Sequence, residues 1–352
     1  MTISRKKFRK NSYPSQLIKQ PLSQSLFYFF LLLFTKNYQN LTLKSFKREP
    51  LSCIINATIF FSEEMTLMEI IEKAPAKINL GLDVLYKRED GYHELEMIMA
   101  SIDLADRLTF RPLKEEKIII ETNSGFLPTD RKNNIFQAIE VMKKNYPFEG
   151  GVHVELQKNI PVAAGLGGGS SDAAATFRGI NKLFQLNAEM EDLMRLSIPI
   201  GTDIPFCLQG STALVTGLGE VVTPLSKPLP QCWVVLVKPN ISVSTPRVFS
   251  KINVDDLPHP NISLLKEAIE QDDYQKMTKH LGNSLEAYTA SKYPVVKTIQ
   301  ERMIQFGADA AVMSGSGPTV VALCEKHSRA LHIANSLKGF CREVYVVRTL
   351  KQ

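Results

Sequence analysis

A glycine-rich segment suited to phosphate binding spans residues 161–176 and has the sequence Pro-Val-Ala-Ala-Gly-Leu-Gly-Gly-Gly-Ser-Ser-Asp-Ala-Ala-Ala-Thr. Its four glycines let the backbone turn tightly and approach a ligand without interference from a Cβ atom. Residues 170–172 are of the types that cap helices, and the alanines at 173–175 favour a helix. A helix that begins here presents free N–H groups and the positive end of its dipole to an anion. The segment therefore predicts a loop that holds the phosphates of a nucleotide.

Two better-known phosphate motifs do not match this segment. No Gly-Lys-Ser/Thr follows the glycines, which excludes a P-loop. No acidic residue ends a following strand at the distance that a dinucleotide-binding fold requires. On these residues alone, an ordinary glycine-rich turn that caps a helix remains an alternative.

The composition is that of a globular chain with an unusual beginning. The 352 residues are 44% hydrophobic and 22% charged, and the formal net charge is +6. Residues 1–67 hold 10 Lys/Arg and 3 Asp/Glu, whereas the other 285 residues hold 32 and 33. Residues 68–352 are therefore nearly neutral, which argues against nucleic acid as a partner.

The cysteines indicate a reducing environment. Five of them, at positions 53, 207, 232, 324 and 341, are scattered singly, without a CxxC pair or a Cys/His cluster. This pattern argues against both a zinc site and a disulfide scaffold. We expect a cytoplasmic protein.

Residues 1–67 differ from the rest and are predicted to be a basic extension, disordered or no part of the working protein. Their apolar run at 26–34 is far shorter than the ~20 residues that a membrane helix needs. A transit peptide that targets an organelle is one interpretation. The favoured one is an upstream start codon, with the working protein beginning at Met65 or Met68, because the extension has no core pattern of its own.

Alternation and helical periodicity predict the elements that must position this loop. Strands are predicted at 70–86 (interrupted at Pro75), 96–104, 108–111, 117–121, 151–157, 232–238, 310–313, 319–324 and 344–348. Helices are predicted at 134–145, from the glycine-rich loop to about 184, and at 189–196, 264–285 and 294–306, with a loop at 201–206.

The order of these elements predicts an α+β fold, an α/β sandwich, with two domains. Three prolines between residues 224 and 230 mark the boundary, so the domains are predicted as 68–226 and 227–352.

Three separated motifs stand in order along the chain: residues 74–80 (Ala-Pro-Ala-Lys-Ile-Asn-Leu), 161–176, and 314–319 (Ser-Gly-Ser-Gly-Pro-Thr). Together they resemble the GHMP kinase superfamily. Residues 87–93 (Lys-Arg-Glu-Asp-Gly-Tyr-His) and 102–106 (Ile-Asp-Leu-Ala-Asp) make the chain similar to one family within it. That family phosphorylates 4-diphosphocytidyl-2-C-methyl-D-erythritol in non-mevalonate isoprenoid synthesis. The resemblance covers residues 68–352.

The resemblance implies a two-domain fold with the active site in the cleft, ATP as co-substrate, and Mg²⁺ bridging the phosphates. No protein ligand for the metal is predicted. The implied ATP-binding residues are Pro161, Val162, Ala163, Ala164, Gly165, Leu166, Gly167, Gly168, Gly169, Ser170 and Ser171. A second glycine loop, with Gly315, Ser316, Gly317 and Thr319, is implied to close the site.

The resemblance also implies that Asp203 and Lys77 act at the transferred phosphate. Phosphoryl transfer to an alcohol needs a carboxylate for the hydroxyl proton and positive charge beside the phosphoryl oxygens, which these two residues supply. On sequence alone, a turn in which Asp203 bonds its own backbone is the favoured explanation, and the resemblance reverses this preference. For Lys77, a strand lysine that reaches solvent is the alternative. Asp172 is expected to be an anion near a helix N-terminus rather than a metal ligand.

Five residues are expected at the acceptor substrate: Asn79, Tyr92, His93, Thr245 and Phe249. By resemblance, Tyr92 and Phe249 stack on the cytosine and His93 bonds its edge, although such aromatic residues are also common in cores. Strand alternation places Asn79 on the same face as Lys77.

The small-molecule substrate is the expected partner, with no nucleic acid, no stable membrane association, and a monomer or homodimer as the assembly. Two other interpretations stay open. One is a GHMP kinase for a small alcohol such as mevalonate or homoserine. The other is a catalytically silent nucleotide-binding module on the same fold, which could lose Lys77 or Asp203.

Overall fold

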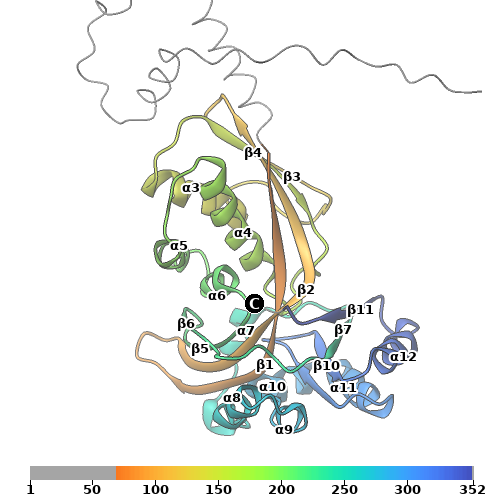
Figure 1. The fold of residues 1–352 in the computed structure, drawn as a ribbon. Helices are drawn as coiled ribbons and strands as arrows, with labels where there is room; N and C mark the ends of the chain where they lie inside the picture. The colour runs from red at the N-terminus through yellow and green to blue at the C-terminus, as the bar shows by residue number, and fades with distance from the viewer. Residues whose placement is uncertain (1–68, 351–352) are drawn as a thin grey trace, which may run out of the picture. The chain divides into compact units, whose positions relative to one another are not determined.

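The computed structural model describes residues 69–350, which lie within the compact unit Phe61–Gln352 (Figure 1). The predicted basic extension, residues 1–67, lies outside the described residues. The described residues form two β-sheets with helices packed against both, so the predicted α+β class is confirmed.

The first two strands form a long antiparallel hairpin that is central to the fold. Strand β1 spans Ile70–Lys87 and β2 spans His93–Leu113, and the turn between them contains Gly91 with φ +86°. The predicted break at Pro75 is wrong, as β1 is one continuous strand. A register shift between Pro75 and Lys77 accommodates the proline, which has no N–H to donate to the ladder.

Two register shifts in β1 change which side chains face each core. A second shift lies between Asn79 and Gly81. Between the shifts, Ile78 and Leu80 pack in an inter-sheet cluster with Val234 and Leu236 of the second sheet. Beyond them, the even-numbered Ala74 and Leu82 pack in the other hydrophobic cluster. At the second shift β1 has one residue more than β2, and this extra residue reverses the alternation.

The first sheet carries helices on one side of the hairpin (Figure 1). Its strand order is β3-β4-β2-β1-β8, and β5 pairs with β2 and β6. The further strands are β3 (Ile118–Thr122), β4 (Gly151–Gln157), β5 (Thr212–Gly217), β6 (Val221–Pro224) and β8 (Gly282–Asn283). The helices are α3 (Asn134–Asn145), α4 (Gly168–Leu183), α5 (Met190–Ser197) and α6 (Ile204–Gln209).

The second sheet is antiparallel, with the order β11-β7-β10-β9. Its strands are β7 (Trp233–Lys238), β9 (Ala310–Met313), β10 (Val320–Cys324) and β11 (Glu343–Arg348). The remaining helices are α7 (Thr245–Phe249), η2 (Val254–Asp256), α8 (Ile262–Glu270), α9 (Tyr274–Lys279), α10 (Ser284–Lys292), α11 (Val295–Gln305) and α12 (His327–Lys338). The domain boundary predicted at 226 falls between β6 and β7 and stays a prediction.

The single helix predicted over 264–285 is wrong, because that segment divides into α8, α9, β8 and the start of α10. Asp272 has φ +58°, which stops α8. The side chains of Asp273 and Asn283 then accept N–H groups of Lys276 and Leu285 and start the next two helices. The loop predicted at 201–206 is also wrong, since α6 begins at Ile204.

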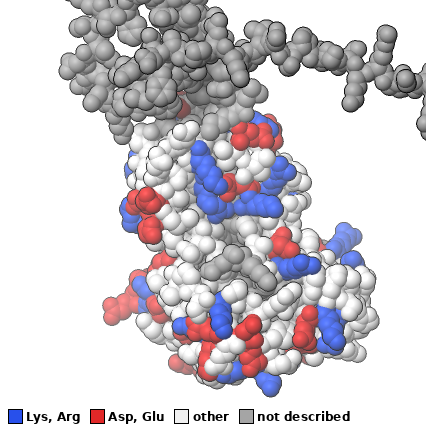
Figure 2. Space-filling view, in the orientation of Figure 1, with Lys and Arg blue, Asp and Glu red and all other residues white. Residues whose placement is uncertain are grey.

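Neither sign of charge dominates the face in Figure 2, where Lys and Arg side chains alternate with Asp and Glu. This agrees with the near-neutral composition of residues 68–352. Within residues 69–350, no helix combines the length and the apolar composition that crossing a membrane requires.

The contact between α4 and β2 gives a test of packing in the first sheet. A Cβ atom on Gly179 would lie 2.4 Å from the ring of the fully buried Phe110. We expect Gly179→Ala to lower the free energy of unfolding by about 1–2 kcal/mol, because overpacking outweighs the roughly 1 kcal/mol gain in helix propensity. Urea unfolding followed by circular dichroism measures the change. Gly339→Ala is the matched control, since nothing lies within 4 Å of its Cβ position; equal stability of the two variants would contradict the packing.

Candidate active site

A cavity of about 570 Å³ opens at the N-terminus of α4. Its walls include both predicted catalytic residues, Lys77 and Asp203, and all predicted phosphate-loop residues from Pro161 to Ser170. Five further predicted residues also line it: Asn79, Thr245 and Phe249, and Gly315 and Ser316 of the second glycine loop. Five predicted residues lie outside its walls: Ser171, Tyr92, His93, Gly317 and Thr319.

The phosphate loop leaves the first N–H groups of α4 without a side-chain cap. Gly167 is the N-cap residue, has φ +66°, and has no side chain that could accept from the first turn. The N–H groups of that turn, which have no partner within the helix, and the positive end of the dipole of this 16-residue helix therefore face the cavity. This arrangement can bind phosphate.

The two glycine loops contact each other directly through their backbones. Ser314 Oγ donates to the carbonyl oxygen of Gly165 over 3.0 Å and accepts the N–H of Asn79 over 3.2 Å. A Cβ atom on Gly165 would lie 2.3 Å from the carbonyl oxygen of Ser314. The N–H of Lys77 donates to the carbonyl oxygen of Leu166 over 3.0 Å, so β1 is fixed to both loops.

Sequence reasoning missed the residue that shapes the second glycine loop. Asn283 donates from Nδ2 to the carbonyl oxygens of Met313 and Gly315, both over 2.7 Å. At the cavity side of the loop, the hydroxyls of Thr245 and Ser316 lie 2.7 Å apart. No motif surrounds Asn283, so only its place in β8, beside β1, shows the role.

Lys77 and Asp203 form an ion pair at the wall of the cavity. Lys77 Nζ lies 3.4 Å from Asp203 Oδ2 and donates to Asn79 Oδ1 over 2.8 Å. The Lys77 side chain is 6% exposed and that of Asp203 is 31% exposed, so the ammonium is held while the carboxylate is accessible. Asp203 is the N-cap residue of α6, but its side chain makes no cap hydrogen bond. It is therefore free to accept a proton from a ligand.

The predicted aromatic residues are only partly brought together. His93 and Phe249 have ring centroids 5.4 Å apart at an interplanar angle of 35°. Burial, and then the charge of Lys87, lower the pKa of His93, which favours the neutral imidazole. Tyr92 is 63% exposed.

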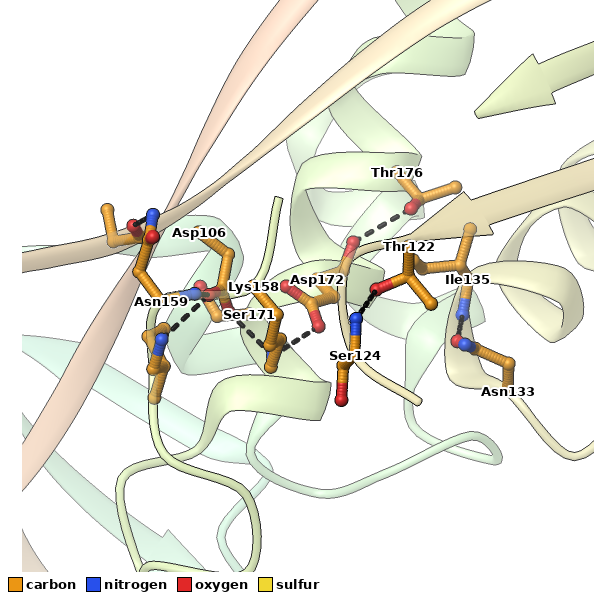
Figure 3. A network of polar contacts seen from close by, with 12 residues as sticks. Asp106, Thr122, Ser124, Asn133, Ile135, Lys158, Asn159, Ser171, Asp172 and Thr176 are labelled. Atoms are coloured by element: carbon orange, nitrogen blue, oxygen red, sulfur yellow. Dashed lines mark hydrogen bonds and ion pairs between the residues drawn. The ribbon is translucent and has the colours of Figure 1, made fainter. Parts of the chain in front are cut away.

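Part of the cavity wall is formed by residues that sequence reasoning did not identify. They are Leu127, Pro128, Lys132, Asn133 and Asn134. Asn133 is the N-cap of α3 and accepts the N–H of Ile135 over 2.9 Å (Figure 3). These residues come from a loop and the start of a helix, and no phosphate-binding motif marks them in the sequence.

A buried ion network lies beneath the phosphate loop (Figure 3). Lys158 Nζ lies 2.6 Å from Asp106 Oδ2 and 2.5 Å from Asp172 Oδ2. Asp106 also accepts the N–H groups of Asn159 and Ile160, which lead into the loop. Asp172 is the fifth residue of α4 and is buried, so it pairs with Lys158 and does not cap the helix.

One group of potential metal ligands exists among residues 69–350, and it is outside this cavity. Glu121, His153 and Glu155 have ligand atoms within 4.8 Å of one another on β3 and β4. The guanidinium of Arg111 already pairs with Glu155 over 2.5 Å, which opposes a bound cation. Among the described residues, the walls of the cavity contain no such group.

The chain matches known sequence families over both sheets. The GHMP kinases N terminal domain matches residues 133–211, and the GHMP kinases C terminal domain matches residues 261–343. The 4-diphosphocytidyl-2-C-methyl-D-erythritol kinase of Enterococcus faecalis is 58% identical over 284 residues, which cover 81% of this chain and 100% of that relative. The kinase with the same name from Levilactobacillus brevis is 52% identical over 284 residues, 80% of this chain and 100% of the relative.

Solved structures agree with these matches. A crystal structure of 4-(cytidine 5'-diphospho)-2C-methyl-D-erythritol kinase aligns with a TM-score of 0.69 and 34% identity, covering 81% of this chain and 100% of that chain. Homoserine kinase from Cytophaga hutchinsonii aligns with a TM-score of 0.66 and 22% identity, covering 81% and 96%, and shows the fold alone.

The backbone contact between the glycine loops gives a second test. We expect Gly165→Ala to weaken ATP binding by about tenfold or more, because a Cβ at φ +75° is strained and displaces the carbonyl of Ser314. Fluorescence titration with an ATP analogue measures the affinity. Gly125→Ala serves as the control, since nothing lies within 4 Å of its Cβ position. Unchanged affinity in the Gly165 variant would show that the loops do not depend on this contact.

Proposed function

Because the chain belongs to the 4-diphosphocytidyl-2-C-methyl-D-erythritol kinase family of the GHMP kinases, we propose that it transfers a phosphoryl group from ATP to the 2-hydroxyl of 4-diphosphocytidyl-2-C-methyl-D-erythritol. The products are the 2-phosphate and ADP, in non-mevalonate isoprenoid biosynthesis. The observation that carries the proposal is the Lys77–Asp203 pair, 3.4 Å apart in the cavity at the N-terminus of α4.

In the proposed reaction Asp203 is the general base. The acceptor oxygen attacks the γ-phosphorus, its proton passes to the carboxylate of Asp203, and the bond to the β-phosphate oxygen breaks to release ADP. Lys77 holds the acceptor oxygen and offsets the negative charge that develops on the phosphoryl group. Asn79 accepts from Lys77 and fixes the direction in which the ammonium points.

The phosphates of ATP are proposed to lie on the glycine-rich loop. The free N–H groups at the start of α4 and its dipole favour this negative charge. Mg²⁺ would neutralise the phosphates and be held mainly by their own oxygens, because the described cavity residues include no ligand cluster for it. Asn133 and Asn134 also line the cavity and are proposed to lie beside the bound nucleotide.

The cytidine end of the acceptor is proposed to bind beside Phe249. Its ring lines the cavity and lies against His93, whose neutral imidazole suits a hydrogen bond to a base edge. Tyr92 is exposed next to this pair and is available to stack on a ligand. A reducing, cytoplasmic setting is also proposed, because the four described cysteines are free and buried.

The general-base role predicts the effect of removing one charge. We expect Asp203→Asn to lower kcat by about 100-fold or more with a smaller change in the KM for ATP. Coupled measurement of ADP release, with ATP, Mg²⁺ and the cytidyl substrate, gives both constants. Asp273→Asn is the matched control, because asparagine caps a helix as well as aspartate does.

Two outcomes of this assay would overturn the proposal. One is turnover in the Asp203 variant above a tenth of the parent rate. The other is phosphorylation of mevalonate or homoserine, but not of the cytidyl substrate, by the unchanged protein. A folded protein that binds ATP and phosphorylates none of them would point to the silent module.

The cytidine site predicts a separate effect on substrate affinity. We expect Phe249→Ala to raise the KM for the acceptor by roughly 5- to 100-fold, as loss of a stacking contact of about 1–3 kcal/mol implies. The KM for ATP should stay constant. Phe340→Ala is the control, because Phe340 lies on the surface over Arg302. An equal change in both KM values would argue against a cytidine-specific contact.

A further inference from the structure

The ion network beneath the phosphate loop contains more negative charge than positive charge. Asp106, Lys158 and Asp172 have side chains that are 0%, 6% and 5% exposed, and a single ammonium lies between the two carboxylates (Figure 3). With all three groups ionised, the network has a net charge of −1 in the interior of the protein. Buried charge without a partner is unfavourable, so one carboxylate is under pressure to take a proton.

The hydrogen bonds decide which carboxylate that is. Asp106 accepts from Lys158 and from the N–H groups of Asn159 and Ile160, all three of which stabilise its charged form. Asp172 accepts only from Lys158, and its Oδ1 atom is buried without any partner. Burial raises the pKa of Asp172 to about 8, and the charge of Asp106 adds to the effect while Lys158 opposes it.

This unsatisfied carboxylate lies beside the predicted phosphate site. Lys158 and Asp172 both line the cavity, and Asp172 is in the second turn of the helix whose N-terminus faces it. The Cβ position of Gly168, the first residue of α4, is 3.0 Å from Lys158 Nζ. A polyphosphate bound there adds negative charge close to Asp172, and burial of the Asp172 side chain, which is 5% exposed, weakens the screening of this interaction.

Other charged groups around Asp172 do not remove this conflict. Lys158 after β4 and Asp106 of β2 are its direct neighbours. From α6, the buried thiol of Cys207 faces the same region, and its high pKa of about 12 keeps it neutral. Lys77 of β1 pairs with Asp203 instead.

We propose that a bound nucleotide stabilises the protonated form of Asp172, so that nucleotide affinity and protonation of this buried carboxyl are linked and binding takes up a proton at alkaline pH. The proposal rests on the proposed function, since it places nucleotide phosphates on the loop from 161 to 171. The neutral acid still accepts from Lys158 through Oδ2, while Lys158 and Asp106 remain as a balanced ion pair. The network then adds no net charge to that of the phosphates.

The linkage has a definite sign. A bound polyanion stabilises the protonated form, which raises the pKa of Asp172 further in the complex. Well below about pH 8, the free protein is already protonated at Asp172, so binding takes up no proton and the affinity is constant. Above about pH 8, binding takes up nearly one proton and the affinity falls by up to about tenfold for each pH unit.

Isothermal titration calorimetry of the full chain with ADP and Mg²⁺ tests this. Titrations over about pH 6 to 10, each in two buffers with different heats of ionisation, give the number of protons taken up. We expect uptake to rise toward one proton at alkaline pH in the unchanged protein. Asp172→Asn mimics the neutral acid, so it should remove that proton and make the affinity independent of pH. Free ADP has the same protonation equilibrium whichever variant is titrated. Its own contribution to the measured proton uptake therefore cancels when the variants are compared.

Asp203→Asn is the matched control, because it removes a carboxylate from the same cavity and should keep the proton uptake. Uptake that persists in the Asp172 variant, or is absent from the unchanged protein across the pH range, would overturn the proposal. If Asp172→Asn does not fold, the infrared difference spectrum of the unchanged protein replaces it, and a new protonated-carboxyl band on ADP binding is expected. Absence of that band would overturn the proposal, as absence of proton uptake would.

The two proposals fail in different ways. ADP binding with proton uptake but without turnover of the cytidyl substrate would contradict only the proposed function. Turnover with ADP binding that takes up no proton would contradict only the role of Asp172. A protein that does not bind ADP would contradict both.

Discussion

Three backbone segments meet where no side chain fits, and the site is built around that contact. The phosphate loop, the second glycine loop and β1 join through Gly165, Ser314 and the backbone of residues 77–79. The Cβ positions of Gly165 and Gly167 are filled by a carbonyl oxygen and by the Lys77 stem, so these glycines are required for space as well as for φ. Because the contact joins segments from both sheets, it sets the distances between the phosphate site, Lys77 and the second loop.

Two lysines of the cavity have different roles because their surroundings differ. Lys77 faces one amide and one partly exposed carboxylate, so Asp203 stays accessible to a substrate. Lys158 is enclosed by two buried carboxylates, one of which, Asp106, accepts the N–H groups of the turn that leads into the phosphate loop. A buried pair of this kind is costly to desolvate and gains from complete hydrogen bonding. Asp106 has that bonding and Asp172 does not, which makes Asp172 the responsive member of the network.

Register shifts in β1 link the fold to the chemistry. Simple alternation over residues 70–87 would keep one set of side chains facing one core along the whole strand. The shifts at Pro75/Lys77 and Asn79/Gly81 exchange the two faces over a short stretch. Lys77 and Asn79 lie within that stretch and line the cavity, while Ile78 and Leu80 fill the inter-sheet cluster. The predicted shared face of Lys77 and Asn79 is confirmed by their 2.8 Å hydrogen bond.

The sequence by itself determined the features that depend on local backbone chemistry: α3 at Asn134–Asn145, β4 at Gly151–Gln157, and the helix that begins inside the glycine-rich loop. It also supplied the motifs that indicate the family. It did not show that the segment 264–285 divides into several elements, nor that α6 begins within residues 201–206. Isolated cap residues are weak signals of where a helix begins or ends. Only the tertiary structure decided which distant residues meet. The hydrogen bonds of Asn283 to the second loop, the place of Asn133 in the cavity wall and the partnerless oxygen of Asp172 depend on contacts between segments far apart in the chain. Local propensity contains no information about those contacts.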